Sequence, residues 1–447
     1  MDACGCHDPV DCGECDTRRN ACDERDWGRD ERDRADSTSG PCGCAEPAPG
    51  AVKDPFDGGR DSDDIGVETL RPWSPIVPNP CGSGGLSTRR EGFFIELPPL
   101  ALGGVPSRWS DPLQSHATGE VTFPICAPPP GGFPCVFIQH GYIWLDGRGD
   151  GPACRVPTPT ALRSAQPPSY QGYRYLANAL AAHGYCVVSL DVRFVIAWNA
   201  LVRQRTSGGL PACQVFYVRA RHMLRAMLGF RLGRGPVPID RNKIALIGHS
   251  NGGAAALVAQ HINQSFLGGM FGVQAVVGLD PNTSWPTSAD GDCSPLLPAG
   301  GRGPLNLQGA DYLVFPSECD ISFDQDLGRI VAISQGAAGV TRVEGRNFHH
   351  QNFNTVWEAE LAHEYSGLCP GRTCTLGPSP TSRWGSNHWN GARQQRVVVC
   401  YTTALLLWRF SHHRQFYEYL EWKRPLPPGL SSAAVRTVQH WPTVRSA

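Results

Sequence analysis

Short apolar runs alternate with polar and glycine- or proline-rich segments along most of the chain. Runs rich in β-branched and aromatic residues are typical of strands, and they lie at 91–97, 119–125, 135–139, 185–191, 243–247, 274–280, 310–316 and 340–344. We expect the run at 340–344 to be the last strand. Longer stretches of helical character predict helices at 173–182, 218–230, 254–262 and 397–408.

The order of these elements predicts the fold class. Strands alternate with helices through most of the chain, and this alternation is typical of α/β proteins with a parallel sheet. The sequence therefore predicts an α/β fold with a mostly parallel central sheet flanked by helices. The 51 glycines and 39 prolines among 447 residues indicate that much of the chain forms loops.

The first 70 residues differ from the rest of the chain. They hold charged residues and cysteines with almost no aliphatic side chains, so they cannot form a hydrophobic core of their own. We divide the chain into a cysteine-rich polar segment, residues 1–70, and a domain that contains the predicted sheet, residues 71–447. The cysteine spacing leaves a poorly ordered tail, a zinc site and disulfides as alternatives for the segment. Its cysteines are Cys4, Cys6, Cys12, Cys15, Cys22, Cys42 and Cys44.

Charge and hydropathy limit the classes of partner. The formal net charge is −1 and no long basic block occurs, so neither nucleic acid nor an anionic membrane surface is indicated. The apolar run at 397–408 is too short to span a bilayer and predicts a core helix. No apolar signal-peptide core follows Met1, which slightly favours the cytoplasm, while the 18 cysteines leave the redox compartment open.

Some cysteines outside the first segment have predicted roles. Two pairs are spaced closely enough to close small disulfide loops. The pairs are Cys126 with Cys135 and Cys369 with Cys374. Cys186 falls in a predicted strand and Cys400 in a predicted helix, and we expect both to be small buried hydrophobic residues.

The sequence Gly248-His249-Ser250-Asn251-Gly252-Gly253 joins a predicted strand to a predicted helix without a spacer. A Gly-x-Ser-x-Gly turn in this setting is typical of a nucleophilic serine at the tip of a strained turn. The glycines leave room for backbone that packs tightly on both sides. We predict Ser250 as the nucleophile and the Asn251 N–H, at the start of the helix, as a donor to a developing oxyanion.

A second oxyanion donor is predicted after an earlier strand. The strand at 135–139 is followed by His140-Gly141-Tyr142, the position at which this kind of site places another backbone N–H. We assign that donor to Tyr142. The irregular loops at 143–169 and 281–309 are expected to wall the substrate site, with Trp144 and Trp285 as candidate substrate-binding residues.

A serine nucleophile needs a base within reach of its hydroxyl and an acid that orients the base. Ser250, Asp320 and His350 follow one another in the order nucleophile, acid, base, with the acid at a strand end and the histidine after the last predicted strand. We therefore assign the acid to Asp320 and the base to His350.

Alternatives remain for the acid and the base. Asp280 also ends a predicted strand, and His349 is adjacent to His350, so that one of the two imidazoles is expected to point away. Asn352 and Asn354 suggest a capped helix start that would fix the loop, which favours His350. Further candidates, less favoured by position, are Glu318, Asp324, Asp326 and His388, whereas His249 is expected to pack or bond locally.

These residues together resemble the α/β-hydrolase superfamily over about residues 119–409. Within it they are similar to the dienelactone-hydrolase-like branch, which includes chlorophyllases, platelet-activating-factor acetylhydrolases and cutinase-type polyester hydrolases. The resemblance is carried by His140-Gly141-Tyr142, the helix-to-strand passage from Tyr175 to Tyr185, the Gly248–Gly253 motif, Asp320, and His350 before Asn354. Ser250 stands where true dienelactone hydrolases have cysteine.

The resemblance implies a catalytic domain with a Ser-His-Asp triad, an oxyanion hole made by the Tyr142 and Asn251 amides, no metal and no cofactor. The expected activity is hydrolysis of small-molecule or lipid-like carboxylic esters through an acyl-enzyme. One alternative is an amidase or peptidase that uses the same triad. Another is a binding protein that keeps the fold without activity and functions through its cysteine-rich segment.

Overall fold

The computed structural model describes residues 87–102, 115–141, 168–195, 198, 212–282, 305–317, 334, 336–345, 348, 350–356, 387–424, 430 and 434–442. All of these residues belong to one unit of the chain, Ser62–Ala447. The predicted boundary near residue 70, the cysteine-rich segment before it and the pair Cys369 and Cys374 lie outside the described residues.

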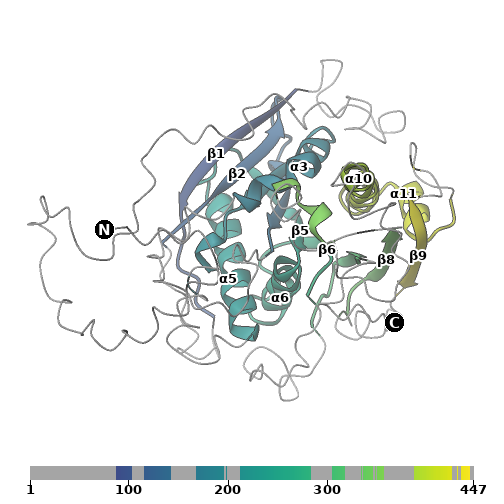
Figure 1. Ribbon diagram of the computed structural model, residues 1–447. Helices are drawn as coiled ribbons and strands as arrows, with labels where there is room; N and C mark the ends of the chain where they lie inside the picture. The colour runs from purple at the N-terminus through teal and green to yellow at the C-terminus, as the bar shows by residue number, and fades with distance from the viewer. Residues whose placement is uncertain are drawn as a thin grey trace, which may run out of the picture. The chain divides into compact units, whose positions relative to one another are not determined.

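Within the described residues, nine strands form one sheet in the order β1-β2-β4-β3-β5-β6-β7-β8-β9 (Figure 1). Neighbouring strands from β4 through to β8 run parallel, whereas β1, β2 and β9 pair with their neighbours antiparallel. The mostly parallel α/β sheet predicted from the sequence is confirmed. The strands are β1 (Thr88–Glu96), β2 (His116–Pro124), β3 (Phe133–Gln139), β4 (Cys186–Leu190), β5 (Ile239–His249), β6 (Val273–Leu279), β7 (Asp311–Phe315), β8 (Gly339–Gly345) and β9 (Val435–Pro442).

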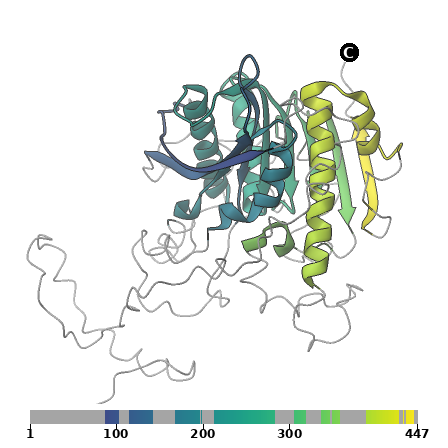
Figure 2. The same ribbon diagram turned by 90° about the horizontal axis from the view of Figure 1, so that it is seen from above.

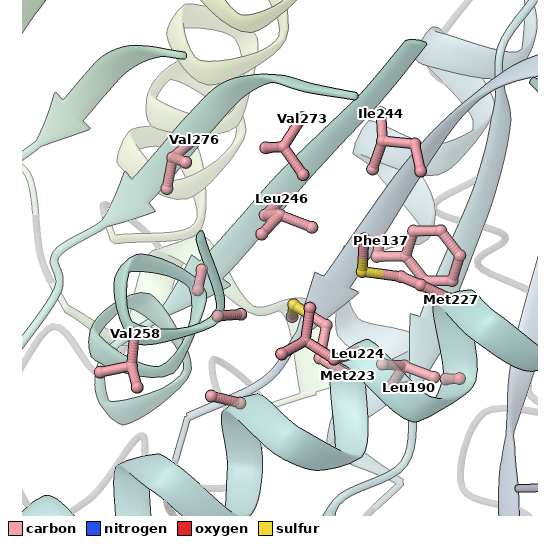
Figure 3. Packing of buried hydrophobic residues seen from close by; sticks show 14 of the residues in the cluster. Phe137, Leu190, Met223, Leu224, Met227, Ile244, Leu246, Val258, Val273 and Val276 are labelled. Atoms are coloured by element: carbon pink, nitrogen blue, oxygen red, sulfur yellow. The ribbon is translucent and has the colours of Figure 1, made fainter. Parts of the chain in front are cut away.

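Alternate residues of each strand point to opposite sides of the sheet, so a strand that is apolar throughout has side chains to bury on both faces. Helices cover both faces. In β3, Phe137 packs with one apolar cluster and Ile138 with the other. The first cluster includes side chains of α5 (Ala212–Arg231) and α6 (Asn251–Ser265), and Figure 3 shows Met223 and Met227 of α5 facing the strand residues. The second includes α3 (Arg174–Ala181), α10 (Asn387–Ser411) and Leu420 of α11 (Arg414–Leu420), and Figure 2 shows the long helix α10 beside the sheet. Two short 3-10 helices complete the described elements, η4 (Ser169–Tyr173) and η5 (Gln351–Phe353).

The predicted core helix at 397–408 lies within α10, where Val397 and Leu406 are fully buried. Among the described helices, none combines the length and apolarity that a membrane crossing requires.

Two expectations from the sequence are wrong. The strand at 340–344 is not the last one, because β9 pairs antiparallel with β8 at the edge of the sheet. The apolar signal of β9 is weak, since an edge strand buries few of its side chains, here Val435 and Val438.

The expected pairing of Cys126 with Cys135 is also wrong. Cys126 is disulfide-bonded, but Cys135 is a free thiol in the core of the sheet, opposite Cys186 on β4. Burial and the neighbouring thiol raise the pKa of Cys135 well above its usual value. Cys186 and Cys400 are buried, as expected.

The strand order reverses direction beside β3. The chain leaves β3 for β4 on one side and then returns to β5 on the other side of β3. Parallel α/β sheets commonly bind ligands outside the carboxyl ends of the strands at such a reversal. The carboxyl ends of β3 and β5 carry His140 and Ser250, respectively.

Candidate active site

Ser250 lies in a strained turn between a strand and a helix. β5 ends at His249 and α6 begins at Asn251, so Ser250 is the one residue between them. Its φ of 57° and ψ of −124° lie in a region that L residues rarely adopt. Such a conformation persists where the surrounding structure holds it in place, and it is a common feature of functional sites. We call residues 248–253 the Ser250 turn.

The glycines of the Ser250 turn are required by close approaches of the backbone. A Cβ on Gly248 would lie 2.0 Å from the Gly252 carbonyl oxygen, inside the turn itself. A Cβ on Gly252 would lie 2.2 Å from the Gln139 carbonyl oxygen, at the end of β3. The first turn of α6 therefore packs directly against the end of β3, which brings the two segments that the sequence assigned to the oxyanion hole next to each other.

The start of α6 presents backbone donors on this side of the sheet. The Ser250 carbonyl accepts the amides of Gly253 at 2.9 Å and Ala254 at 3.3 Å. Among the described residues the Asn251 N–H has no backbone acceptor, as is usual for the first amide of a helix. The Asn251 side chain is anchored, because its Oδ1 accepts a hydrogen bond of 2.9 Å from Asn282 Nδ2.

His350 and Asp280 form a hydrogen-bonded pair. His350 Nδ1 lies 2.6 Å from Asp280 Oδ2, and the other carboxylate oxygen accepts the Ser317 N–H at 2.9 Å. Asp280 is fully buried, whereas 14% of the His350 side chain is exposed. The buried carboxylate thus fixes the ring at Nδ1, and part of the His350 side chain remains exposed to solvent.

Three contacts tie this pair to the Ser250 turn. The Ser250 N–H donates to the Leu279 carbonyl at 3.0 Å, and the Asn282 N–H donates to the Ser250 carbonyl at 3.0 Å, so the residues on both sides of Asp280 are bonded to the serine. The rings of His249 and His350 lie 4.6 Å apart between centroids. The Ser250 turn, His350 and Asp280 therefore lie next to one another, from the ends of β5 and β6 and the loop after β8.

The structure describes only some of the other predicted site residues. Asp280, one of the two candidate acids, is hydrogen-bonded to His350. Asp320, the acid that the sequence favoured, lies outside the described residues. The same holds for Tyr142, His349, Trp144, Trp285 and the side chain of His388. Within the part of the chain that the structure describes, no cluster of three or more His, Cys, Asp and Glu residues is arranged to hold a metal ion.

Two buried histidines near the turn are held neutral. Burial, with a smaller contribution from Arg219, lowers the pKa of His140 to about 3. Burial, followed by the neighbouring His350, holds the pKa of His249 well below its usual value. Neither imidazole is suited to general-base chemistry near neutral pH, and His249 bonds locally, with its Nδ1 3.0 Å from the Tyr173 hydroxyl.

Sequence reasoning missed two polar residues at this end of the sheet, Tyr173 and Arg219. Both are fully buried. The Tyr173 hydroxyl lies 3.0 Å from His249 Nδ1. Arg219 bonds the end of β3. A signal for Arg219 exists in the sequence, because it lies at helical spacing from Phe216 and Met223 and hence on the apolar stripe of its helix.

Compared with models of protein families and with curated protein sequences, the chain gives no match. The functional interpretation therefore depends on the fold and on the geometry at the ends of β3, β5 and β6.

Proposed function

We propose that the chain is a serine hydrolase of the α/β-hydrolase superfamily that cleaves carboxylic esters through an acyl-enzyme. The observation that carries the proposal is the pairing of His350 with Asp280 at 2.6 Å beside a strained, glycine-enclosed serine. A nucleophile, a base and an acid in this chain order are the three parts that the chemistry requires. The packing of the first turn of α6 against the end of β3 supports an oxyanion hole between them.

The hydrogen bond to Asp280 determines which imidazole nitrogen acts as the base. An ionised carboxylate accepts hydrogen bonds and donates none, so His350 Nδ1 carries the ring proton and Nε2 keeps its lone pair. Nε2 takes the proton of the Ser250 hydroxyl while the oxygen attacks the ester carbonyl carbon and the carbonyl electron pair moves to the carbonyl oxygen. Asp280 then stabilises the imidazolium that forms.

The remaining steps use the same groups. The tetrahedral intermediate collapses by breaking its bond to the alcohol oxygen, which receives the proton from His350 Nε2, and the acyl group stays on Ser250. A water molecule, deprotonated by Nε2, attacks the acyl carbon, and the carboxylic acid leaves as Ser250 regains its proton. In both halves of the reaction the Asn251 and Tyr142 amides bind the oxyanion.

Intact-mass labelling with a fluorophosphonate tests the proposal together with hydrolysis of p-nitrophenyl acetate, butyrate and octanoate. The wild-type protein should gain one adduct and lose its esterase activity in parallel. Ser250→Ala should gain none, and its kcat should fall by roughly 10⁶-fold because triad members act as a unit. Ser265→Ala, which changes a serine at the other end of α6, is the matched control and should behave as wild type. No adduct on folded wild-type protein would overturn the proposal.

A matched ester and anilide with the same acyl group separate esterase from amidase activity. The proposal predicts fast release of p-nitrophenol from the ester and slow release of p-nitroaniline from the anilide. Comparable rates on the two substrates would assign the same triad to amide cleavage.

A further inference from the structure

Asn354 is a fully buried asparagine shortly after His350, and no step of the proposed reaction uses it. Its side-chain amide is bonded at both ends. Nδ2 donates to the Ser169 carbonyl of η4 at 2.8 Å, and Oδ1 accepts the Val356 N–H at 3.0 Å. A buried amide is costly unless it is hydrogen-bonded, so its partners indicate what it holds together. Asn354 joins the segment that carries the proposed base to η4.

Two further features fit η4 to this segment. Gly172 of η4 has no side chain where Asn354 packs, since a Cβ there would lie 1.8 Å from Asn354 Oδ1. The hydroxyl of the next residue, Thr355, donates to the Gly172 carbonyl at 3.3 Å. We call Asn354 and Thr355, with their bonds to Ser169 and Gly172, the η4 clasp.

The chain between the η4 clasp and His350 is held along its length. η5 follows His350 directly and ends at Phe353, immediately before the clasp. The Asn352 carbonyl accepts Gln395 Nε2 of α10 at 3.0 Å, and the Tyr175 hydroxyl of α3 donates to the Phe353 carbonyl at 3.2 Å. A short turn that is bonded at successive residues moves as a unit, so a shift of the clasp is passed on to His350.

The same short helix η4 also holds the Ser250 turn. Tyr173 is the last residue of η4, and its hydroxyl lies 3.0 Å from Nδ1 of His249. His249 immediately precedes Ser250. The segment that carries the proposed base and the turn that carries the proposed nucleophile are therefore bonded to one element.

We propose that Asn354 is a positioning residue for His350: it docks the segment that carries the base on η4, which also holds the Ser250 turn, and so sets the imidazole in place relative to the serine. This inference rests on the proposed serine hydrolase function. The two reacting groups come from different elements, and a misplacement of about 1 Å can lower the rate by about 10²-fold.

A matched control lies in the last turn of α6. Asn263 is also fully buried, and its Nδ2 donates to the Phe271 carbonyl at 2.9 Å while its Oδ1 accepts the Phe271 N–H at 3.0 Å. Phe271 precedes β6, so these bonds lie at the amino end of that strand, away from Ser250. A role limited to stability predicts similar effects of the two asparagines, whereas a positioning role predicts a loss of turnover for Asn354 alone.

The experiment compares Asn354→Leu, Thr355→Val and Asn263→Leu in the full chain, at a temperature at which the variants are folded. It measures kcat and KM on p-nitrophenyl butyrate, the rate constant of labelling by a fluorophosphonate, and urea unfolding. A fourth measurement is the low-field proton resonance of His350 Nδ1–H, which reports the bond to Asp280 and is assigned by its disappearance in His350→Gln.

We expect Asn354→Leu to lower kcat and the labelling rate by about 10- to 100-fold, with KM little changed and the resonance shifted or broadened. Thr355→Val should show a smaller loss in the same direction. Asn263→Leu should keep the wild-type kcat, labelling rate and resonance, even where it loses as much stability as Asn354→Leu.

Two outcomes overturn the inference. One is a folded Asn354→Leu protein whose kcat, labelling rate and resonance match those of Asn263→Leu. The other applies if Asn354→Leu does not fold, in which case Thr355→Val decides, since it removes the other bond of the η4 clasp and nearly keeps the shape of the side chain. Unchanged kcat and resonance in Thr355→Val then reject the inference. Failure of the wild-type protein to take the fluorophosphonate is a different result, because it rejects the proposed function itself.

Discussion

Replacing Asp280 with asparagine changes one atom of the acid and is predicted to abolish most activity. The reason is the Ser317 N–H, which donates to Asp280 Oδ1 at 2.9 Å and, as a main-chain donor, cannot reverse. An asparagine must therefore place its oxygen at that position and its NH₂ group at the position that faces His350 Nδ1. The imidazole then has to accept at Nδ1 and carry its proton on Nε2, where it cannot take the proton of Ser250.

The size of the effect follows from this tautomer. A triad that keeps its geometry but has the wrong tautomer loses about 10⁴-fold in kcat, which corresponds to about 5.5 kcal/mol of transition-state stabilisation at about 1.4 kcal/mol for each factor of ten. The asparagine can still bond both the Ser317 N–H and His350 Nδ1. We therefore expect the free energy of unfolding to change by about 1 kcal/mol or less, and KM to stay close to the wild-type value.

The assay is steady-state hydrolysis of p-nitrophenyl butyrate by Asp280→Asn and Asp320→Asn, with urea unfolding of both variants. Asp320→Asn is the control that separates the two candidate acids and should keep kcat within about threefold of wild type. The reasoning is refuted if Asp280→Asn retains kcat within about tenfold of wild type. A large loss in Asp320→Asn alone would move the role of the acid to that residue.

Three further predictions concern the surroundings of the triad. Tyr173→Phe removes a buried hydroxyl that bonds His249 and should lower the free energy of unfolding by about 1–3 kcal/mol, whereas Tyr185→Phe, whose hydroxyl has no partner among the described residues, should be nearly neutral in the same urea titration. Gly252→Ala introduces a Cβ 2.2 Å from a carbonyl oxygen and should cost about 1–3 kcal/mol and most of the kcat. Gly92→Ala, whose Cβ would approach other atoms no closer than 3.9 Å, is the control, and equal effects would contradict the steric argument. The pKa of His140 is about 3 in the folded protein, so the unfolded chain binds a proton that the folded chain does not. Its contribution to stability is complete above about pH 6.5 and is lost as the pH falls toward 3, at up to about 1.4 kcal/mol per pH unit. His249 contributes in the same direction, so the loss of stability between about pH 7 and pH 5 should be smaller by about 2 kcal/mol in His140→Gln than in the wild type in urea titrations, and an equal loss in the two proteins would contradict it.

The sequence predicted the parts of the fold that depend on local pattern. Buried parallel strands are short and apolar, and the helix after Ser250 begins without a spacer, so both are visible from neighbouring residues. The edge strand β9 was missed because its residues are only partly buried and carry a weaker pattern. Cys135 was paired wrongly because closeness along the chain does not make two strands neighbours: β4 lies between β2, which Cys126 follows, and β3, which carries Cys135.

The choice between the two candidate acids could not be made from the local sequence. Asp280 and Asp320 both follow a buried strand, β6 and β7 respectively, and nothing in the two local sequences separates them. The difference lies in the strand order, since β6 is the direct neighbour of β5. Its carboxyl end is therefore one strand spacing from Ser250. Arg219 was missed for a related reason, because its partners lie on β3, far away along the chain.

The polar groups around Ser250 are needed because strands end there. Where β3 and β5 stop, the ladder of backbone hydrogen bonds stops with them, and buried polar groups require other partners. The partners come from different elements: Arg219 from α5 bonds the end of β3, and Tyr173 at the end of η4 bonds His249. Each of these bonds exists only when two remote segments have docked. The geometry of the site is therefore coupled to the packing of helices on both faces of the sheet, and substitutions such as Tyr173→Phe should lower kcat at temperatures well below those that unfold the protein.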